Sequence, residues 1–102
     1  MRIIKPSTLT AWAALHANAV PALLHWYETA LAVRWQSLAD ARRDFPHADM
    51  VRVGSLRPVI VFNLAGGKFR LIAAIHFNNG RVFLLDFLTH AEYSKPGWKN
   101  RL

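Results

Sequence analysis

In the first half of the chain, apolar residues recur three or four positions apart, the spacing that places them on one face of a helix. A short strand candidate at Arg2-Ile3-Ile4-Lys5 is followed by Pro6-Ser7, which ends the strand and supplies a helix N-cap. One helix is expected through about His16, and a second after a cap at Asn18, with Pro21 tolerated in its first turn. Their apolar stripes, expected to be core, are Leu9, Trp12 and His16, then Leu23, Leu24, Tyr27 and Leu31.

A short third helix is expected before the middle of the chain. Ser37-Leu38-Ala39-Asp40 approximates a capping box, with Asp in place of the usual Glu or Gln. The helix must end near Phe45, because Pro46 disfavours the helical conformation in the residue before it. Its Arg42 and Arg43 are expected to form a solvated face.

From Val51 onward the pattern changes to β-rich segments with turn residues between them. Three strands are expected, over residues 57–64, 68–77 and 81–88, and they are typical of an antiparallel meander. Helices followed by strands predict an α+β architecture, in which the helices cover one face of the sheet and the other face can stay open.

The length of the loop at Asn78-Asn79-Gly80 decides which side chains share a face of this sheet. A three-residue loop with Gly80 in the left-handed conformation would pair Phe77 with Arg81 and bring Phe83, Leu85 and Phe87 to the core face. A two-residue Asn79-Gly80 turn would slip the register by one residue and mix polar with apolar groups. The three-residue loop is preferred, and it gathers on the opposite face Lys68, Arg70, His76, Asp86 and His90.

The composition is that of one compact domain over residues 1–102, with 53% hydrophobic and 19% charged residues and no cysteine. No signal sequence or stretch long enough to span a membrane is evident, so a cytoplasmic protein is expected. The net charge of +7 is uneven, because residues 1–50 hold five basic and four acidic groups and residues 51–102 hold eight and two. Such a basic half suits a polyanionic partner such as RNA, or an acidic protein, or it simply confers solubility.

The segment Thr89-His90-Ala91-Glu92-Tyr93 follows an apolar strand and carries three side chains that can move protons, His90, Glu92 and Tyr93. RNA supplies its own nucleophile, the 2′-hydroxyl, so a protein needs only proton-transfer groups and cations such as Lys68 and Arg70 that hold phosphate oxygens. The alternative is structural: His90 caps the strand end, Glu92 pairs with a lysine and Tyr93 packs on the sheet edge.

Other chemistries find little support in the sequence. Phosphate-binding and dinucleotide-binding glycine loops, a His-Glu-x-x-His motif and a nucleophile elbow are all absent, and the five histidines lack the spacing of metal ligands. No metal or cofactor is therefore expected. Two tryptophans are candidates for stacking on bases, Trp35 in a loop and Trp98 in a basic tail that is expected to fray.

Taken in order along residues 2 to about 95, the motifs of this chain resemble the HigB toxin family of the RelE/ParE superfamily. The segments that carry the resemblance are Arg2-Ile3-Ile4, the helix pair, the short helix ending at Phe45-Pro46, Val59-Ile60-Val61-Phe62-Asn63, Lys68-Phe69-Arg70-Leu71, and Thr89-His90-Ala91-Glu92-Tyr93.

The resemblance implies a RelE-like fold, a curved antiparallel sheet with the N-terminal helices packed on one face. It also implies a type II toxin that cleaves mRNA in the A site of the ribosome without a metal, and that a HigA-like helix-turn-helix antitoxin holds inactive. The matching catalytic candidates are Lys68, Arg70, His90, Glu92 and Tyr93. Further candidates for RNA binding are Arg57, Arg81, Lys95 and Lys99.

The chain departs from similar toxins at three positions. Ser94 stands where Asp is frequent, and Leu85 and Ala74 stand where basic residues are frequent. Two other functions therefore remain open, inhibition of DNA gyrase as in ParE-like members, and non-catalytic binding of RNA or protein by the basic face.

Overall fold

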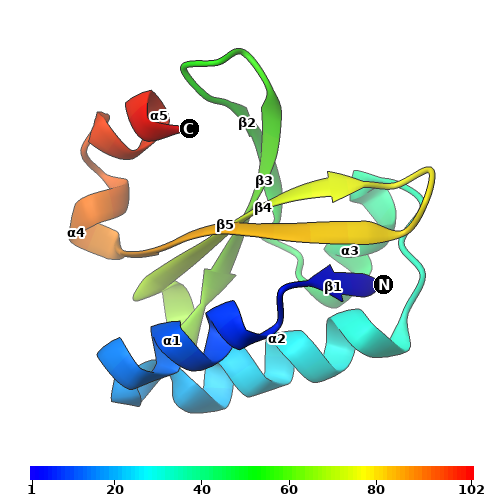
Figure 1. Cartoon of the computed structure of the whole chain (residues 1–102), viewed down its shortest axis with the longest axis horizontal. Coiled ribbons are helices and arrows are strands. Elements are labelled where there is room, and N and C mark those ends of the chain that lie inside the picture. Colours follow the sequence, from blue (N-terminus) through cyan, green and yellow to red (C-terminus); the bar gives the residue numbers. More distant parts are fainter.

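The computed structural model describes residues 1–102 and is built on one five-stranded sheet with the order β1-β5-β4-β3-β2 (Figure 1). The strands are β1 (Arg2–Ile4), β2 (Asp49–Arg52), β3 (Pro58–Leu64), β4 (Phe69–His76) and β5 (Arg81–Thr89). The helices are α1 (Ser7–Leu15), α2 (Val20–Ala32), α3 (Leu38–Asp44), α4 (His90–Tyr93) and α5 (Gly97–Arg101), with short 3-10 turns η1 (Ala17–Ala19) and η2 (Ala65–Gly67). The predicted α+β class is confirmed.

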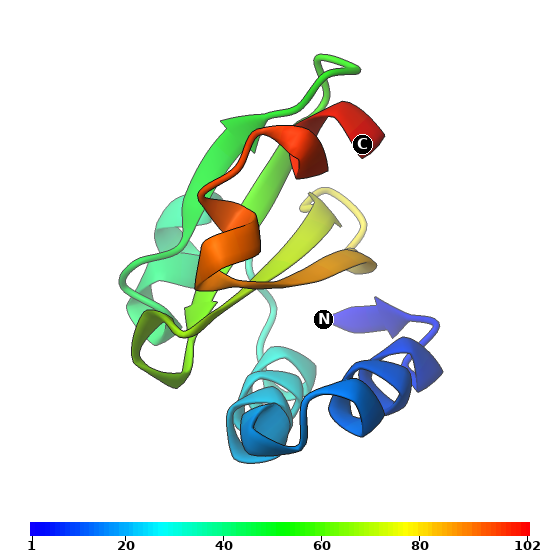
Figure 2. The same ribbon diagram turned by 90° about the vertical axis from the view of Figure 1, so that its left-hand side faces the viewer.

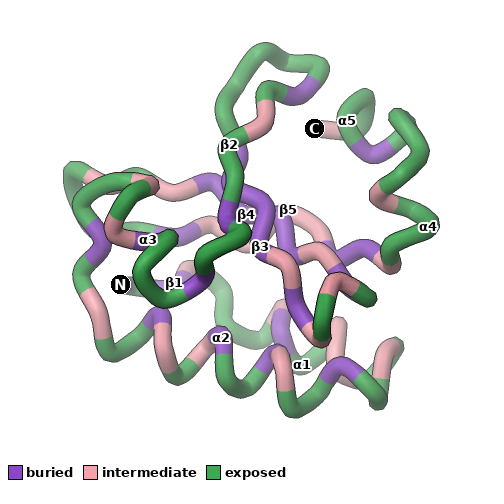
Figure 3. The backbone as a smooth tube through the Cα atoms, turned by 180° about the vertical axis from the view of Figure 1, so that it is seen from behind, coloured by how far each residue is buried: buried purple, intermediate pink, exposed green.

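Helices α1 and α2 cover one face of the sheet and bury their apolar stripes against it (Figures 1 and 2). The buried positions of α2 are Leu23, Trp26 and Ala30, whose spacing follows the helical repeat. Leu24 and Leu31, expected in the core, are instead 53% and 48% exposed, because they lie away from the side that meets the sheet. The strands in the middle of Figure 3 are largely buried, so the core lies along the sheet.

The caps of the first helices differ from the prediction, whereas the cap of the third agrees with it. Pro6, not Ser7, is the N-cap of α1, and η1 replaces the expected cap at Asn18. In α3 the Ser37 side chain accepts a hydrogen bond from the Asp40 backbone N–H, and the helix ends before Phe45.

The sheet is mixed, because β1 pairs with β5 in parallel while β2 to β5 form the expected antiparallel meander. The prediction of an antiparallel sheet is therefore wrong for the β1–β5 pair. The helices α1 to α3 and the strands β2 to β4 all lie between β1 and β5 in the chain, so the pairing is a long-range contact that short hairpin rules do not reveal.

The loop between β4 and β5 has four residues, not three, since His76 rather than Phe77 lies opposite Arg81. This slip places Val82 in the core beneath the helices and turns Phe83 to the other face, where its ring lies 4.9 Å from that of His76. Gly80 does adopt the expected left-handed conformation, with φ of 71°.

A β-bulge then restores the expected register at the other end of the hairpin. Ala73 pairs with Leu84 but Ile72 pairs with Asp86, so Leu85 is the extra residue. Beyond it, Arg70 lies opposite Leu88, as a three-residue loop would have placed it. The prediction that Phe83 and Leu85 lie on the core face is therefore wrong, and the same prediction for Phe87 is confirmed.

The second face of the sheet is not open, because the C-terminal segment folds over it (Figure 2). Trp98 of α5 is only 2% exposed and forms a second cluster with Val59, Val61, Ile72 and Leu88. Arg101 fixes the same segment through an ion pair with Asp86, at 2.7 Å. The prediction of a frayed tail is wrong, since the large apolar area of the indole favours burial over solvation.

No helix combines the length and the apolar character needed to cross a membrane.

Candidate active site

Arg70 enters the candidate site from the second position of β4, near η2, where β3 ends, β4 begins and β5 ends. Its side chain is half-buried, and Nη1 donates hydrogen bonds to the backbone carbonyls of Gly67 and, at 3.4 Å, Phe69. These carbonyls hold one edge of the guanidinium, so the other edge is presented in a fixed direction.

The residues after β5 form a single helical turn, α4, because Thr89 and Glu92 make a capping box. The Thr89 hydroxyl accepts from the Glu92 N–H at 3.2 Å, and the Glu92 carboxylate accepts from the Thr89 N–H at 2.9 Å. The His90 N–H donates to the Lys68 carbonyl at 2.9 Å, which ties the turn to the start of β4. The box therefore fixes where His90 and Tyr93 lie.

Arg70 contacts both of these α4 side chains. Its Nη2 lies 3.5 Å from His90 Nδ1, and its guanidinium carbon lies 5.0 Å from the centre of the Tyr93 ring. A guanidinium can only donate, so Nδ1 is the acceptor in this contact and Nε2 of His90 is left for another partner. Three of the predicted catalytic residues, Arg70, His90 and Tyr93, thus lie together in the structure.

Trp98 supports Tyr93 from α5. The two rings stack with centroids 5.3 Å apart, and the indole N–H donates to the Tyr93 carbonyl at 3.0 Å. Trp98 is therefore a packing residue, and its predicted role in stacking on bases is wrong. The same holds for Trp35, which is 2% exposed and donates from its indole to Asp44 at 2.8 Å.

Glu92 has a structural partner that the sequence prediction missed. The hydrogen bond from the Thr89 backbone N–H, aided by the Thr89 hydroxyl and by the charges of His16 and Arg101, holds the pKa of the Glu92 carboxyl below its ordinary value. A carboxylate stabilised in this way is a weaker base. Its place in the box, rather than a lysine partner, makes Glu92 a residue that positions α4.

The predicted cations are dispersed around this cluster. Lys68 is exposed and directly precedes β4, and its backbone is bonded to His90. Lys95 and Lys99 are exposed on the C-terminal segment, and Arg57 is exposed in the β2–β3 loop. Arg81 lies at the opposite end of the hairpin, about 20 Å away along the strands at ~3.3 Å per residue.

Two of the positions at which the sequence prediction noted a missing basic residue lie in apolar surroundings. Ala74 is 8% exposed, and Leu85, the bulge residue, packs against the second cluster. The third departure, Ser94, donates from its hydroxyl to the His90 carbonyl at 2.9 Å and so closes the α4 turn.

A polar hollow of about 310 Å³ adjoins Arg70, and sequence reasoning did not find it. It is lined by His47, Asn63, Gly66 and Gly67. The only available signal was Asn63, a polar residue in the otherwise apolar strand β3.

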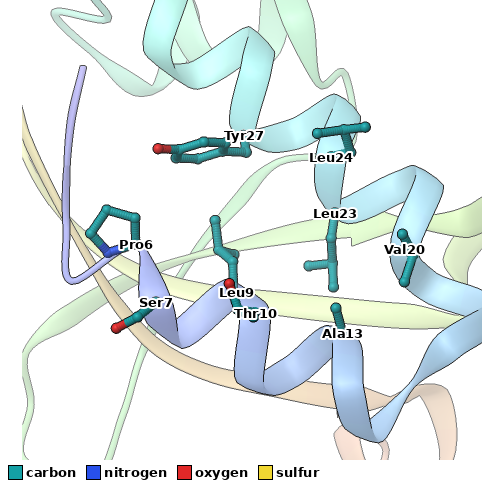
Figure 4. A pocket seen from close by; sticks show the side chains of 9 residues that line it. All are labelled: Pro6, Ser7, Leu9, Thr10, Ala13, Val20, Leu23, Leu24 and Tyr27. Atoms are coloured by element: carbon teal, nitrogen blue, oxygen red, sulfur yellow. The ribbon is translucent and has the colours of Figure 1, made fainter.

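A larger hollow lies between α1 and α2, away from this cluster (Figure 4). Its walls are mostly apolar, with Leu9 and Leu23 facing the space between the two helices, and Leu24 and Tyr27 at its edge. It holds no cation or histidine and so offers no group for phosphate chemistry. Elsewhere, no three His, Cys, Asp or Glu side chains are grouped as metal ligands.

Comparison with known protein families gives a match. A family model named HigB toxin, described as the RelE-like toxic component of a toxin-antitoxin system, matches residues 19–96. This chain belongs to the HigB toxin family. The matched region contains β2 to β5 and α4, and with them Arg70, His90 and Tyr93. No curated protein matches the chain.

Membership in the HigB family has two direct consequences. The chain is the toxic component of a toxin-antitoxin system, and such a system includes an antitoxin as its partner. The mixed sheet with helices on its faces is consistent with the RelE-like fold of this family.

Proposed function

We propose that this HigB toxin is a metal-independent endoribonuclease that cleaves mRNA in the A site of the ribosome and so stops translation. The observation that carries the proposal is the meeting of Arg70 with His90 and Tyr93, at 3.5 Å and 5.0 Å. A fixed cation beside two proton-transfer groups is what cleavage of an RNA phosphodiester by its own 2′-hydroxyl requires.

In the proposed reaction, the 2′-oxygen loses its proton, attacks the neighbouring phosphorus and displaces the 5′-oxygen, which takes up a proton. The products are a 2′,3′-cyclic phosphate and a free 5′-hydroxyl, so no co-reactant is consumed. His90 and the hydroxyl of Tyr93 are the two groups that exchange protons with substrate. The order in which they act is left open.

Arg70 would stabilise the negative charge that develops on the phosphorane oxygens. One edge of its guanidinium is already bound to Gly67 and Phe69, so little reorganisation is needed when charge appears on the other side. Lys68, exposed next to His90, would hold a phosphate oxygen of the same strand. Glu92 acts through α4, by keeping His90 and Tyr93 in place.

The remaining cations would attract the ribosome-bound RNA without reading its sequence. Lys95, Lys99 and Arg57 are exposed and belong to the basic second half of the chain. Arg81 would contact the RNA only if the bound strand extends along the whole β4–β5 hairpin. We further propose that residues 1–102 act as one toxin domain in the cytoplasm, inhibited by a HigA-like helix-turn-helix antitoxin.

Mapping mRNA 5′ ends after induction of the toxin tests this function. We expect new 5′-hydroxyl ends within translated reading frames and growth arrest that the neighbouring antitoxin relieves. Intact mRNA with accumulating DNA breaks would indicate a gyrase inhibitor instead. Binding of RNA that weakens steeply with salt, with no cleavage even on translating ribosomes, would indicate a non-catalytic module.

A further inference from the structure

The polar hollow beside Arg70 is the end of a row of residues that crosses the sheet. Asn63 of β3 lies opposite Arg70 of β4, and Arg70 lies opposite Leu88 of β5. His47 lies in the turn that precedes β2, and it lines the hollow together with Asn63. Neighbouring strands are about 4.8 Å apart, so Asn63 and Arg70 lie side by side on β3 and β4.

Residues opposite one another in a sheet share a face, and this row lies on the face that carries α4. The row therefore leads from the hollow through Asn63 to Arg70, beside which His90 lies at 3.5 Å. The hollow and the candidate active site are continuous parts of one polar surface.

Asn63 is an unusual residue for its position. The residues before it on the same side of β3 are Val59 and Val61, which are 0% and 2% exposed and apolar. Asparagine is disfavoured in strands, and here its half-buried side chain makes no hydrogen bond, whereas the adjacent Arg70 makes several. The Asn63 amide neither favours the strand nor makes a hydrogen bond within the chain, so it is free to bind a ligand.

The other walls of the hollow suit a flat, polar ligand. Gly66 and Gly67 have φ of 65° and 88° and no side chains, so a ligand can approach the backbone closely. The ring of His47 is exposed and can stack on a base, and an amide carries both a donor and an acceptor that match a base edge.

We propose that this hollow binds the nucleobase next to the phosphate held by Arg70, and that Asn63 reads the hydrogen-bonding edge of that base. This inference rests on the proposed ribonuclease function. It makes Asn63 a specificity-determining residue and His47 its stacking partner. The volume of about 310 Å³ is at the lower end of the range found for small-molecule sites.

The test compares Asn63→Asp and Asn63→Val with the unmodified toxin by 5′-end mapping after induction. Asp replaces the amide donor with a second acceptor, and Val matches the two valines that precede it on the same face. We expect both variants to cut mRNA, with the base frequency beside the cut changed by at least about fivefold, the factor for a weak bidentate contact. Asn79→Asp, in the exposed β4–β5 loop, is the matched control and should leave the frequencies unchanged.

Folding is checked separately. Asn63→Val places a residue that favours strands beside the buried Val59 and Val61, so this variant should have a melting temperature equal to or above that of the unmodified toxin. Cutting by both variants with unchanged base frequencies would overturn the inference while leaving the ribonuclease function in place. Absence of cutting by the unmodified toxin would overturn the ribonuclease function itself.

A binding measurement addresses the hollow independently of cleavage. The His90→Ala variant, labelled with nitrogen-15, is titrated with RNA dinucleotides of different base composition. We expect chemical-shift changes at the Asn63 side-chain amide and the Gly66 and Gly67 backbone amides, differing at least severalfold between bases. Shifts confined to residues outside the hollow would contradict the inference.

Discussion

Arg70 and His90 are separated by 20 positions in the chain, yet the guanidinium Nη2 lies 3.5 Å from the imidazole Nδ1. The approach depends on two features, the register of β4 with β5 and the capped turn α4. Each side chain is fixed by its own backbone contacts, so the pair is organised before any substrate arrives.

Removing either member of this pair should slow cleavage strongly while leaving the fold intact. We expect His90→Ala and Arg70→Ala each to slow mRNA cleavage by about 10² to 10⁴, the usual contribution of a proton-transfer group or a fixed charge. Arg70→Lys should not restore activity, because an ammonium lacks the second edge that reaches His90. The rate is measured on translating ribosomes with purified toxin.

The matched controls for this pair are His76→Gln, at the opposite end of β4, and Arg43→Ala, which changes an exposed arginine of α3 that pairs with Asp40. Both should cleave at the unmodified rate. Full toxicity of a His90→Ala, Arg70→Ala double variant would remove these residues from the mechanism.

The capping box should contribute both stability and activity. Thr89→Ala removes the side-chain acceptor of the Glu92 N–H, and we expect a loss of about 1 kcal/mol in unfolding free energy together with slower cleavage. Thr89→Ser keeps the hydroxyl and should retain most of both. Urea denaturation gives the stability, and equal stability of Thr89→Ala and the unmodified toxin would show that the box is dispensable.

The low pKa of Glu92 gives this contribution a pH dependence. Its folded-state pKa lies below the unfolded value of about 4.3, so ionised Glu92 stabilises the fold above that pH and the contribution is lost as the pH falls through the folded value. The difference in unfolding free energy between Glu92→Gln and the unmodified toxin should therefore shrink in acid. A difference that stays constant from neutral pH into acid would contradict this assignment.

Trp98 should be a major determinant of stability, although it lies five residues from the end of α4. Its 2% exposure predicts a loss of about 3 to 5 kcal/mol in Trp98→Ala, since truncation of a buried aromatic residue leaves a cavity. Trp98→Phe keeps most of the packing, loses the hydrogen bond to Tyr93 and should cost less. Both are measured by denaturant unfolding, and a negligible effect of Trp98→Ala would mean that the C-terminal segment is not packed in solution.

Lys68 should contribute to RNA affinity through charge. If it contacts one phosphate, Lys68→Gln should lower the slope of log K against log salt by about 0.7, the value for a single-stranded nucleic acid. Fluorescence anisotropy with a labelled RNA measures the slope. Arg43→Gln, which changes an exposed cation on α3, is the control. An unchanged slope for Lys68→Gln would show that Lys68 does not contact the RNA.

Several elements of the fold follow from local sequence alone. The helix that carries Leu23 and Tyr27, the Ser37 cap and the strand β4 depend on interactions over a few residues, so their physical causes can be read from the chain. The same holds for the Thr89-to-Tyr93 segment as a candidate site, because the strand end and the proton-transfer residues are consecutive in the chain.

Register could not be read in the same way. The alternating pattern favoured a three-residue loop, but a four-residue loop and a bulge at Leu85 compensate each other, and only the second half of the hairpin keeps the predicted pairing. A bulge changes which residues face the core at little local cost, so its position is decided by packing on both faces of the sheet.

The sequence by itself identified five candidate catalytic residues, Lys68, Arg70, His90, Glu92 and Tyr93, and it predicted α1 to α3 and the strands β1, β3, β4 and β5. Only the tertiary structure decided that Arg70, His90 and Tyr93 meet, that Trp98 covers the second face, and that Asn63 and His47 form a hollow beside them. The reason is physical: propensities and caps act between neighbours in the chain, whereas register, the parallel β1–β5 pair and the burial of an indole depend on contacts between distant residues.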